Sequence, residues 1–198
     1  MAGLLVATNN RHKVEEIQDL LGELSVSVQT LLDFPQVGPI EEDAETLEGN
    51  ALKKARQTFL ATGLPTIADD TGLEVGYLNG APGVYSSRFA GPTASYAENC
   101  ALLLHRLRGV PPRRRGARFR SVIAFIGRDG REQLVEGCVR GQIVEEPRGT
   151  QGFGYDPLFL PADHDRTFAE MSLEEKNKIS HRALALARLK PLLAGGLL

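Results

Sequence analysis

Short apolar runs alternate with helical patterns in the first part of the chain. Residues 3–7 form an apolar run typical of a buried strand, and polar residues follow it directly. Over residues 13–21 the apolar side chains fall on one face of a helix. Residues 25–30 alternate as a second strand would. A strand that leads straight into a helix is typical of an α/β fold.

The middle of the chain continues this alternation. Residues 47–62 carry a helical pattern that Gly63 would end. We expect a short strand over 66–68, a further strand over 73–78 and a helix over 94–107.

The last part of the chain predicts a hairpin and a final helix. A strand over 119–128 and its return over 133–143 are joined by the turn signal Asp129-Gly130. A short strand over 157–160 and a last helical segment over 173–193 follow, with Ser180 as a possible cap for a helix that restarts there. Helices mixed with a hairpin and short strands predict an α/β fold with a mixed sheet. No linker divides the chain, so we expect one domain over its whole length.

Composition and charge narrow the functional classes. The 198 residues are 42% hydrophobic and 24% charged, with a net charge of −2, which fits one ordinary domain rather than a nucleic-acid coat protein. Cys100 and Cys138 lie far apart and form no metal motif, so we expect two free thiols in a reducing compartment. No signal peptide and no apolar run of about 20 residues is present. We therefore expect a cytoplasmic protein with no membrane partner.

The junction between the first strand and the first helix is a candidate phosphate site. Free main-chain N–H groups and the helix dipole favour anions there, and a lysine side chain adds a positive charge. Simple helix capping by an asparagine is the alternative. No Walker P-loop occurs in the sequence. The residues of this junction are Thr8, Asn9, Asn10, Arg11, His12 and Lys13.

Two adjacent carboxylates, Asp69 and Asp70, follow the short strand over 66–68. Enzymes built on sheets often place catalytic groups at a strand end, and carboxylate oxygens are the ligands that Mg²⁺ prefers. Neighbouring like charges raise the pKa of one carboxyl group, so one aspartate could act as a base. An Asx-turn closed by Gly72 is an equally open alternative.

A second acidic stretch, residues 41–45, could supply another metal ligand or simply begin a solvated helix. Lys53, Lys54 and Arg56 give the following helix a basic side, and lysines of this kind are often only solvated.

The glycine-rich segment 149–157 suggests a ligand site. Pro157 and the lack of a following helix exclude a dinucleotide fingerprint. The glycines would instead permit close approach of a ligand, with Phe153 or Tyr155 as a stacking surface and Asp156 as a partner for a base edge. A purely structural loop is the alternative.

Two basic segments remain open to more than one interpretation. His181 and Arg182 can donate hydrogen bonds to a carbonyl or a phosphate, although such a pair often lies simply on the surface. The arginines at 113–115, with Arg118 and Arg120, invite an RNA-binding hypothesis. We disfavour it because only one aromatic residue is interleaved and the chain is slightly acidic.

These motifs are weak singly, but their combination and order are specific. They are Thr8-x-Asn10-x-x-Lys13, Glu42 with Thr46 and Asn50-Ala51, and the blocks at 68–73, 80–88, 152–157 and 180–182. The series closely resembles the RdgB/inosine-triphosphatase family, almost from end to end. The resemblance implies a two-lobed α/β fold with a long central mixed β-sheet flanked by helices and a nucleotide cleft between the lobes.

The resemblance also implies a function. Members of the family are similar in being Mg²⁺-dependent homodimers that convert ITP, dITP and XTP to the monophosphate and pyrophosphate. Asp70 would be the general base and a metal ligand, Glu42 the other ligand, and Asp69 a third acidic group at the metal site. The resemblance implies triphosphate contacts at Thr8, Asn10, Lys13, Lys54 and Thr71. It implies nucleoside contacts at Phe153, Gly154, Tyr155, Asp156, Lys176, His181 and Arg182.

The sequence departs from the family pattern at Asn9, Leu47 and Tyr155, where many or some relatives carry Gly, Phe and Trp. None of these positions is ionisable in the proposed chemistry, so we expect tuning rather than loss of activity. A nucleotide-binding sensor without turnover is the competing hypothesis. We expect purine nucleoside triphosphates, and not nucleic acid, as the ligands.

Overall fold

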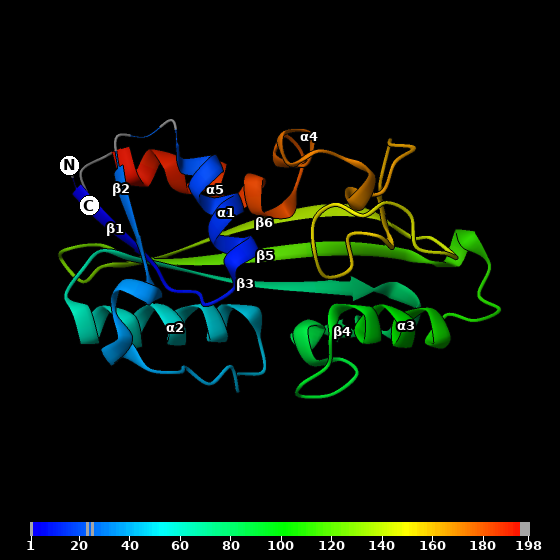
Figure 1. The fold of residues 1–198 in the computed structure, drawn as a ribbon, viewed down its shortest axis with the longest axis horizontal. Coiled ribbons are helices and arrows are strands. Elements are labelled where there is room, and N and C mark those ends of the chain that lie inside the picture. Colours follow the sequence, from blue (N-terminus) through cyan, green and yellow to red (C-terminus); the bar gives the residue numbers. More distant parts are fainter. Residues whose placement is uncertain (1, 23, 25, 195–198) are drawn as a thin grey trace. The chain divides into compact units, whose positions relative to one another are not determined.

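The computed structural model describes residues 2–22, 24 and 26–194 (Figure 1). The strands are β1 (Ala2–Val6), β2 (Val26–Thr30), β3 (Thr66–Val75), β4 (Pro82–Gly83), β5 (Gly116–Ile126), β6 (Glu132–Ile143) and β7 (Phe159–Pro161). The helices are α1 (Arg11–Leu21), α2 (Leu47–Thr62), α3 (Tyr96–Arg106), α4 (Leu173–Asn177) and α5 (His181–Leu192).

The strands form one mixed sheet. Its order is β2-β1-β3-β5-β6-β7, with β4 paired to β3. β1 runs parallel to β2 and to β3, with Leu5 opposite Gln29 and Thr66, whereas β4 and β7 run antiparallel to their neighbours. The predicted mixed α/β fold with a central sheet flanked by helices is therefore confirmed.

Contacts along the chain define two compact units. Unit 1 comprises Met1–Asp70, Ser121–Gly137 and Arg182–Leu198, and unit 2 comprises Thr71–Arg120 and Cys138–His181. Both are discontinuous, because β3, β5 and β6 each contribute residues to the two units. The single two-lobed domain expected from the sequence stays a prediction.

Unit 1 has its own hydrophobic core. Leu4 of β1, Ile17 of α1, Phe125 of β5 and Leu186 of α5 are all fully buried in it. α1 and α5 cover one side of these strands and α2 the other (Figure 1). Burial of one stripe on each helix explains why the helical pattern was readable in the sequence.

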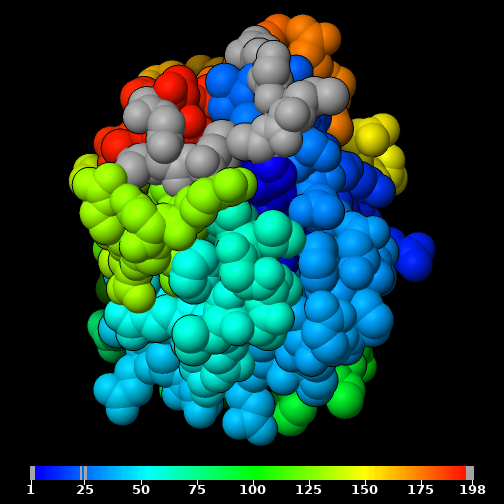
Figure 2. Space-filling model, turned by 90° about the vertical axis from the view of Figure 1, so that its left-hand side faces the viewer, coloured from blue at the N-terminus to red at the C-terminus, as the bar shows by residue number. Residues whose placement is uncertain are grey.

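The second helix shows how local signals fix an element. The Thr46 side chain accepts a hydrogen bond from Gly49 N, and Gly63 closes the helix with a positive φ of 68°. The hairpin between β5 and β6 lies beside α2 on the face shown in Figure 2, where Arg56 Nε donates to Glu132 Oε1 at 2.7 Å. This ion pair also accounts for one of the basic residues on α2.

Unit 2 has a separate and more aromatic core. Phe119, Phe159 and Phe168 contact one another, with ring centroids 4.8 to 6.1 Å apart. Leu103 of α3 and Leu73 of β3 are fully buried in the same cluster. No helix in the described part of the chain is long and apolar enough to cross a membrane.

One expectation about the elements is wrong and another is incomplete. β3 does not stop at residue 68 but continues through the acidic pair to Val75, which also excludes the Asx-turn. The expected final helix is two helices, because Ile179 N and Ser180 N both donate to Lys176 O and end α4. Ser25, the first residue of the expected second strand, lies outside the described residues.

Candidate active site

Asp69 and Asp70 are neighbours in the middle of β3, and both are buried, with exposed fractions of 1% and 5%. Consecutive side chains of a strand point to opposite faces of the sheet. The two carboxylates therefore have different partners, and the chain can give them different chemistry.

The Asp70 carboxylate shares one ammonium group with Glu42. Lys54 Nζ lies 2.9 Å from Asp70 Oδ1 and 2.6 Å from Glu42 Oε1. Asn50 Nδ2 donates to Asp70 Oδ2 at 3.4 Å. Asn50 and Lys54 are four residues apart on α2, so both side chains leave the same face of the helix. Two carboxylate oxygens thus converge on one cationic atom in unit 1.

Burial and neighbouring charges shift the pKa values of Asp70 and Lys54. Burial raises the pKa of Asp70, and the charges of Lys54 and Lys13 offset this only in part. Burial alone would lower the pKa of Lys54, but Asp70 and Glu42 outweigh it, so the Lys54 pKa is raised. At neutral pH the lysine is charged, and Asp70 is the carboxylate that binds a proton more readily than an exposed aspartate.

The Asp69 carboxylate lies in a different environment. Lys13 Nζ is 2.7 Å from Oδ2, Arg182 Nη2 is 3.1 Å from the same oxygen, and Ser121 Oγ donates to Oδ1 at 2.5 Å. Arg182 also pairs with Glu16 of α1. Burial raises the Asp69 pKa, but Arg182 and Lys13 outweigh it and hold the pKa well below its usual range. Asp69 is therefore a fixed anion.

The junction of β1 and α1 is organised by capping. Asn10 Oδ1 accepts from His12 N at 3.1 Å and Lys13 N at 3.3 Å, and Thr8 Oγ1 accepts from Asn10 N at 3.2 Å. The capping alternative for Asn10 is thus what the structure shows. Contact of this junction with phosphate stays a prediction, as it does for the exposed side chains of Asn9, Arg11 and His12.

In unit 2 the glycine-rich segment wraps around Asp156. Its Oδ2 accepts from Phe153 N at 2.9 Å and from Lys176 Nζ at 2.6 Å. A Cβ on Gly152 would lie 2.1 Å from the same oxygen, so this position needs glycine. The Lys176 ammonium also lies 5.0 Å from the centre of the Phe153 ring. The loop therefore presents an aromatic ring next to a buried ion pair.

Tyr155 is an anchor of this loop rather than an exposed stacking surface. It is 4% exposed, and its hydroxyl donates to Ser86 O at 2.9 Å. Ser86 Oγ in turn accepts from Leu73 N and donates to Gly83 O. The block at residues 80–88 thus holds the glycine-rich loop, and burial raises the Tyr155 pKa. Stacking of a ligand on Phe153, whose ring is not fully buried, stays a prediction.

His181 and Arg182 are neighbours in sequence but belong to different units. The His181 ring stacks on Phe119 in unit 2, with centroids 4.6 Å apart and an interplanar angle of 14°. Arg182 is fully buried in unit 1, where its two Nη atoms pair with Glu16 and Asp69. The nucleobase contact expected for Arg182 stays a prediction, and its contacts point instead to support of Asp69.

Other expected residues take these positions. Thr71 continues β3 in unit 2 and is half-buried. Gly154 O accepts from Cys100 Sγ at 3.3 Å, so this glycine also receives a contact from α3.

No group of three or more His, Cys, Asp or Glu side chains suited to a metal ion occurs among the described residues. A metal site would therefore rest on Glu42 and Asp70, whereas the oxygens of Asp69 already serve other groups.

The sequence did not single out Glu16 and Ser121. Glu16 lies on the buried face of α1, and Ser121 is a fully buried residue of β5 directly before its apolar end. A polar side chain at a buried position of an element is the signal that could have found both, because such groups are normally hydrogen-bonded.

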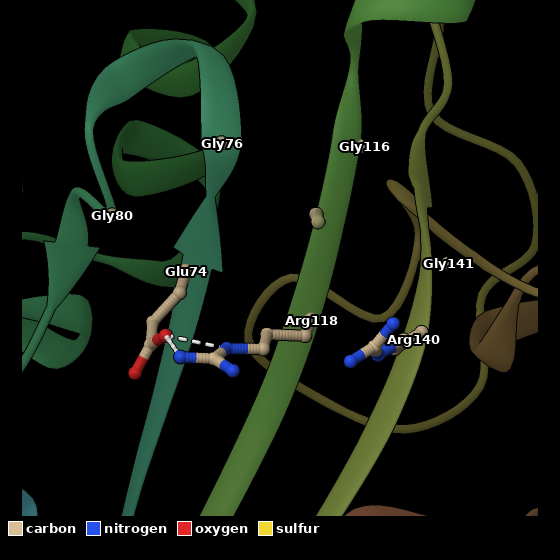
Figure 3. Close-up of a pocket in the computed structure, with 8 residues that line it drawn as sticks. Glu74, Gly76, Gly80, Gly116, Arg118, Arg140 and Gly141 are labelled. Carbon is tan, nitrogen blue, oxygen red and sulfur yellow. Dashed lines mark hydrogen bonds and ion pairs between the residues drawn. The ribbon is translucent and has the colours of Figure 1, made fainter.

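A hollow of about 440 Å³ lies in unit 2 (Figure 3). Glycines of β5 and β6 line it, and Glu74 points at Arg118 across it, with Arg118 Nε 2.6 Å from Glu74 Oε2. None of the residues expected to bind nucleotide lines this hollow.

Comparisons with known proteins agree with the motifs. The model of the Ham1 family matches residues 4–192. The chain is 48% identical to a dITP/XTP pyrophosphatase of Geobacter sulfurreducens, over 96% of each chain. A dITP/XTP pyrophosphatase of Mycobacterium bovis is 49% identical, over 96% of this chain and 94% of the relative.

Solved structures give the same result. A HAM1 protein from Coxiella burnetii superposes with a TM-score of 0.89 at 41% identity, covering 99% of this chain and all of the other. A nucleoside-triphosphatase / dITP/XTP pyrophosphatase from Mycobacterium abscessus gives 0.77 at 44% identity, covering 96% and 99%. The resemblance drawn from the ordered motifs is confirmed, and the chain belongs to the Ham1 family.

Proposed function

We propose that this chain hydrolyses deaminated purine nucleoside triphosphates, namely ITP, dITP and XTP, to the monophosphate and pyrophosphate. It is a hydrolase that acts on phosphoric anhydrides, as the names of its relatives state for those proteins. The observation that carries the proposal is the convergence of Asp70 and Glu42 on the ammonium of Lys54. A buried and a half-buried carboxylate that share one buried lysine suit a reaction that moves negative charge at phosphorus.

The proposed cofactor is Mg²⁺, and the donor set in unit 1 fits it. Mg²⁺ is usually held by one or two carboxylates together with substrate phosphates, rather than by a complete cage of protein ligands. Glu42 and Asp70 supply two carboxylates whose oxygens already lie within 2.9 Å of one shared cation. When bound, the ion would neutralise part of the triphosphate charge. Asp69 is not proposed as a ligand, because Lys13, Arg182 and Ser121 surround its oxygens.

Asp70 is the proposed general base. A base works best when its pKa lies near the working pH, and burial moves the Asp70 pKa upward from that of an exposed aspartate. It would accept the proton of the water that attacks the α-phosphorus, and the bond to the pyrophosphate oxygen would break. Lys13 and Lys54 would balance the charge that develops on the leaving pyrophosphate.

Recognition of the purine is proposed for unit 2. Phe153 offers a ring for stacking, and Lys176 and His181 can donate to a 6-keto oxygen. Adenine would present the donors of its amino group to these donors, and a mismatch of this kind can cost a factor of about 10⁴ in selectivity. Arg182 is omitted from this set, since both of its Nη atoms pair with carboxylates in unit 1.

The RNA-binding hypothesis finds less support in the contacts. Arg115 donates to main-chain carbonyls at Leu107, Val110 and Val144 and is buried. Arg118 and Arg120 pair with Glu74. The contacts of these three arginines lie within unit 2 and do not depend on RNA.

By analogy with the resemblance we also propose a homodimer, which light scattering on the purified protein would test.

One experiment separates turnover from mere binding. The protein is incubated with Mg²⁺ and ITP, dITP, XTP, GTP or ATP, and released pyrophosphate is measured. We expect release from the first three and an Asp70→Asn variant slower by a factor of about 10³ or more, as for the loss of a general base and ligand together.

The matched control is Asp129→Asn, a change of the same kind in the exposed β5–β6 turn, which should keep full activity. Pyrophosphate release from none of the nucleotides would contradict the proposal and favour a sensor. Asp70→Asn within tenfold of the wild type would overturn the assignment of the base.

A further inference from the structure

Ser121 is a polar residue in an apolar stretch of β5. It is fully buried, and the five residues that follow it in the strand are all apolar. A hydroxyl group at such a position is costly unless it forms a hydrogen bond. Its bond is to Asp69 Oδ1, with a length of 2.5 Å.

Asp69 is the common anchor of the two lysines that we propose for the triphosphate. Lys13 Nζ lies 2.7 Å from Asp69 Oδ2, and Lys54 Nζ donates to the Asp69 main-chain oxygen at 2.8 Å. Lys13 Nζ also donates to the Asp69 main-chain oxygen, at the longer distance of 3.4 Å. Rotation of the Asp69 carboxylate therefore moves the shorter of the two Lys13 contacts, whereas the contact between Lys54 and Asp69 depends only on the main chain.

The two carboxylate oxygens of Asp69 receive different donors. Oδ2 receives the cations Lys13 and Arg182, and Oδ1 receives the hydroxyl of Ser121. The torsion between Cβ and the carboxylate of an aspartate has no sharp staggered minimum of its own. A donor on Oδ1 therefore sets the plane of the group, and with it the direction in which Oδ2 faces Lys13.

We propose that Ser121 is a positioning residue for pyrophosphate release. By fixing the plane of the Asp69 carboxylate, it holds the Lys13 ammonium where that group binds the triphosphate. This inference rests on the proposed function for the role of Lys13, but the coupling of Ser121 to Lys13 stands on the contacts alone.

The first test compares Ser121→Ala with Ser121→Thr. The alanine variant should lower kcat/KM for dITP about tenfold, the size expected for one hydrogen bond to a charged group. The threonine variant keeps the hydroxyl and should stay within about threefold of the wild type. Threonine adds a methyl group to a packed site, so its melting temperature should fall at least as far as that of the alanine variant.

The threonine variant is thus expected to be the more active of the two but not the more stable. A purely structural role of Ser121 would not produce these opposite orders of activity and stability. If activity followed melting temperature, so that threonine lost as much activity as alanine, the proposal would be overturned. Thr58→Val is the matched control, because Thr58 is also fully buried in unit 1 and its hydroxyl has no hydrogen-bond partner among the described residues. It removes a buried hydroxyl and should leave kcat/KM unchanged.

The second test is a cycle with Lys13→Met. If Ser121 acts through Lys13, adding Ser121→Ala to the methionine variant should change kcat/KM by less than about twofold. A tenfold loss in both backgrounds would show that Ser121 acts by another route and would contradict the proposal.

A third measurement does not need turnover. The ε-methylene NMR signal of Lys13, assigned with Lys13→Met, should shift in Ser121→Ala and keep its position in Ser121→Thr. If the signal does not move in the alanine variant, the proposed coupling between Ser121 and Lys13 is contradicted. If the wild type releases no pyrophosphate while this signal shifts, the proposed function fails and the positioning contact survives.

Discussion

The carboxylates of Asp69 in unit 1 and Asp156 in unit 2 are both almost completely buried, yet they are neutralised in different ways. Asp69 sits in the middle of a sheet strand and receives two cations and a hydroxyl. Asp156 sits in a glycine-rich loop and receives one lysine and a main-chain N–H. The Lys176 ammonium also lies over the rings of Phe153 and Phe168, 5.0 and 5.5 Å from their centres.

This difference indicates a division of labour within the molecule. A buried charge with several partners on strands and helices can hardly move, because each partner would have to move too. A buried pair in a loop has fewer constraints and can adjust to a ligand. We therefore expect unit 1 to hold a fixed arrangement for the phosphates, and the loop of unit 2 to provide adaptable contacts for the base.

The largest effect should come from removing the cations. Arg182→Met leaves two buried carboxylates, on Glu16 and Asp69, without their shared partner, whereas Lys176→Met leaves only Asp156. Loss of one partner of a buried ion pair costs about 3–5 kcal/mol, so we expect about 5 kcal/mol for Arg182→Met and about 3 kcal/mol for Lys176→Met. Urea unfolding of both variants measures the difference. A greater loss for Lys176→Met would contradict the comparison.

An intermediate effect should come from the loop itself. Gly152 and Gly154 have similar positive φ angles of 70° and 64°, but only at Gly152 would a Cβ meet Asp156, at 2.1 Å from Oδ2. Gly154→Ala should therefore cost about 1 kcal/mol from backbone strain alone, and Gly152→Ala about 3 kcal/mol or more. Thermal unfolding of this matched pair tests the prediction, and equal losses would show that Asp156 can move away freely.

The smallest effect concerns Cys100, which reports the charge of Asp156. Burial and, second, the Asp156 charge raise the pKa of this thiol to about 11. The folded state favours the neutral thiol, so this contribution to stability is fully present below about pH 9 and is lost as the pH rises through 11. The rate of iodoacetamide labelling at Cys100, followed by peptide mass spectrometry against pH, measures the midpoint.

The same measurement on Asp156→Asn gives the sharper result. Removal of the neighbouring charge should move the Cys100 midpoint to lower pH while leaving it above that of an exposed thiol. A midpoint at or below pH 9 in the wild type would mean that the thiol is not shielded by unit 2.

Much of the fold was readable because local signals and packing agree. α2 begins after Thr46 and ends at Gly63 as expected, since the cap and the left-handed glycine act within a few residues. The end of β3 was predicted wrongly at the acidic pair, because there the local signals and the tertiary contacts disagree. The charges of this pair are balanced by Lys13, Lys54 and Arg182, which are far away in sequence, so the strand continues where local preference predicts a break.

The candidate site was predictable only in part. The ordered motifs identified Glu42, Lys54 and Asp70, which the structure brings together in unit 1. They also grouped Arg182 with His181, because adjacent residues in a motif give no hint that one serves each unit. Ser121 and Glu16 were missed because a single polar residue in an apolar pattern has a partner that only the tertiary structure reveals.

The position of the acidic pair inside a strand also limits how the sequence can change length. Deleting or inserting one residue between Thr66 and Asp69 would turn every later side chain of β3 to the other face. After such a deletion, Asp70 would take the place of Asp69 beside Arg182 and Ser121, and Thr71 would take the place beside Lys54. Lys54 would then lose its buried carboxylate partner. Natural and engineered variation in this family is therefore expected to tolerate point substitutions in β3 far better than single-residue insertions or deletions.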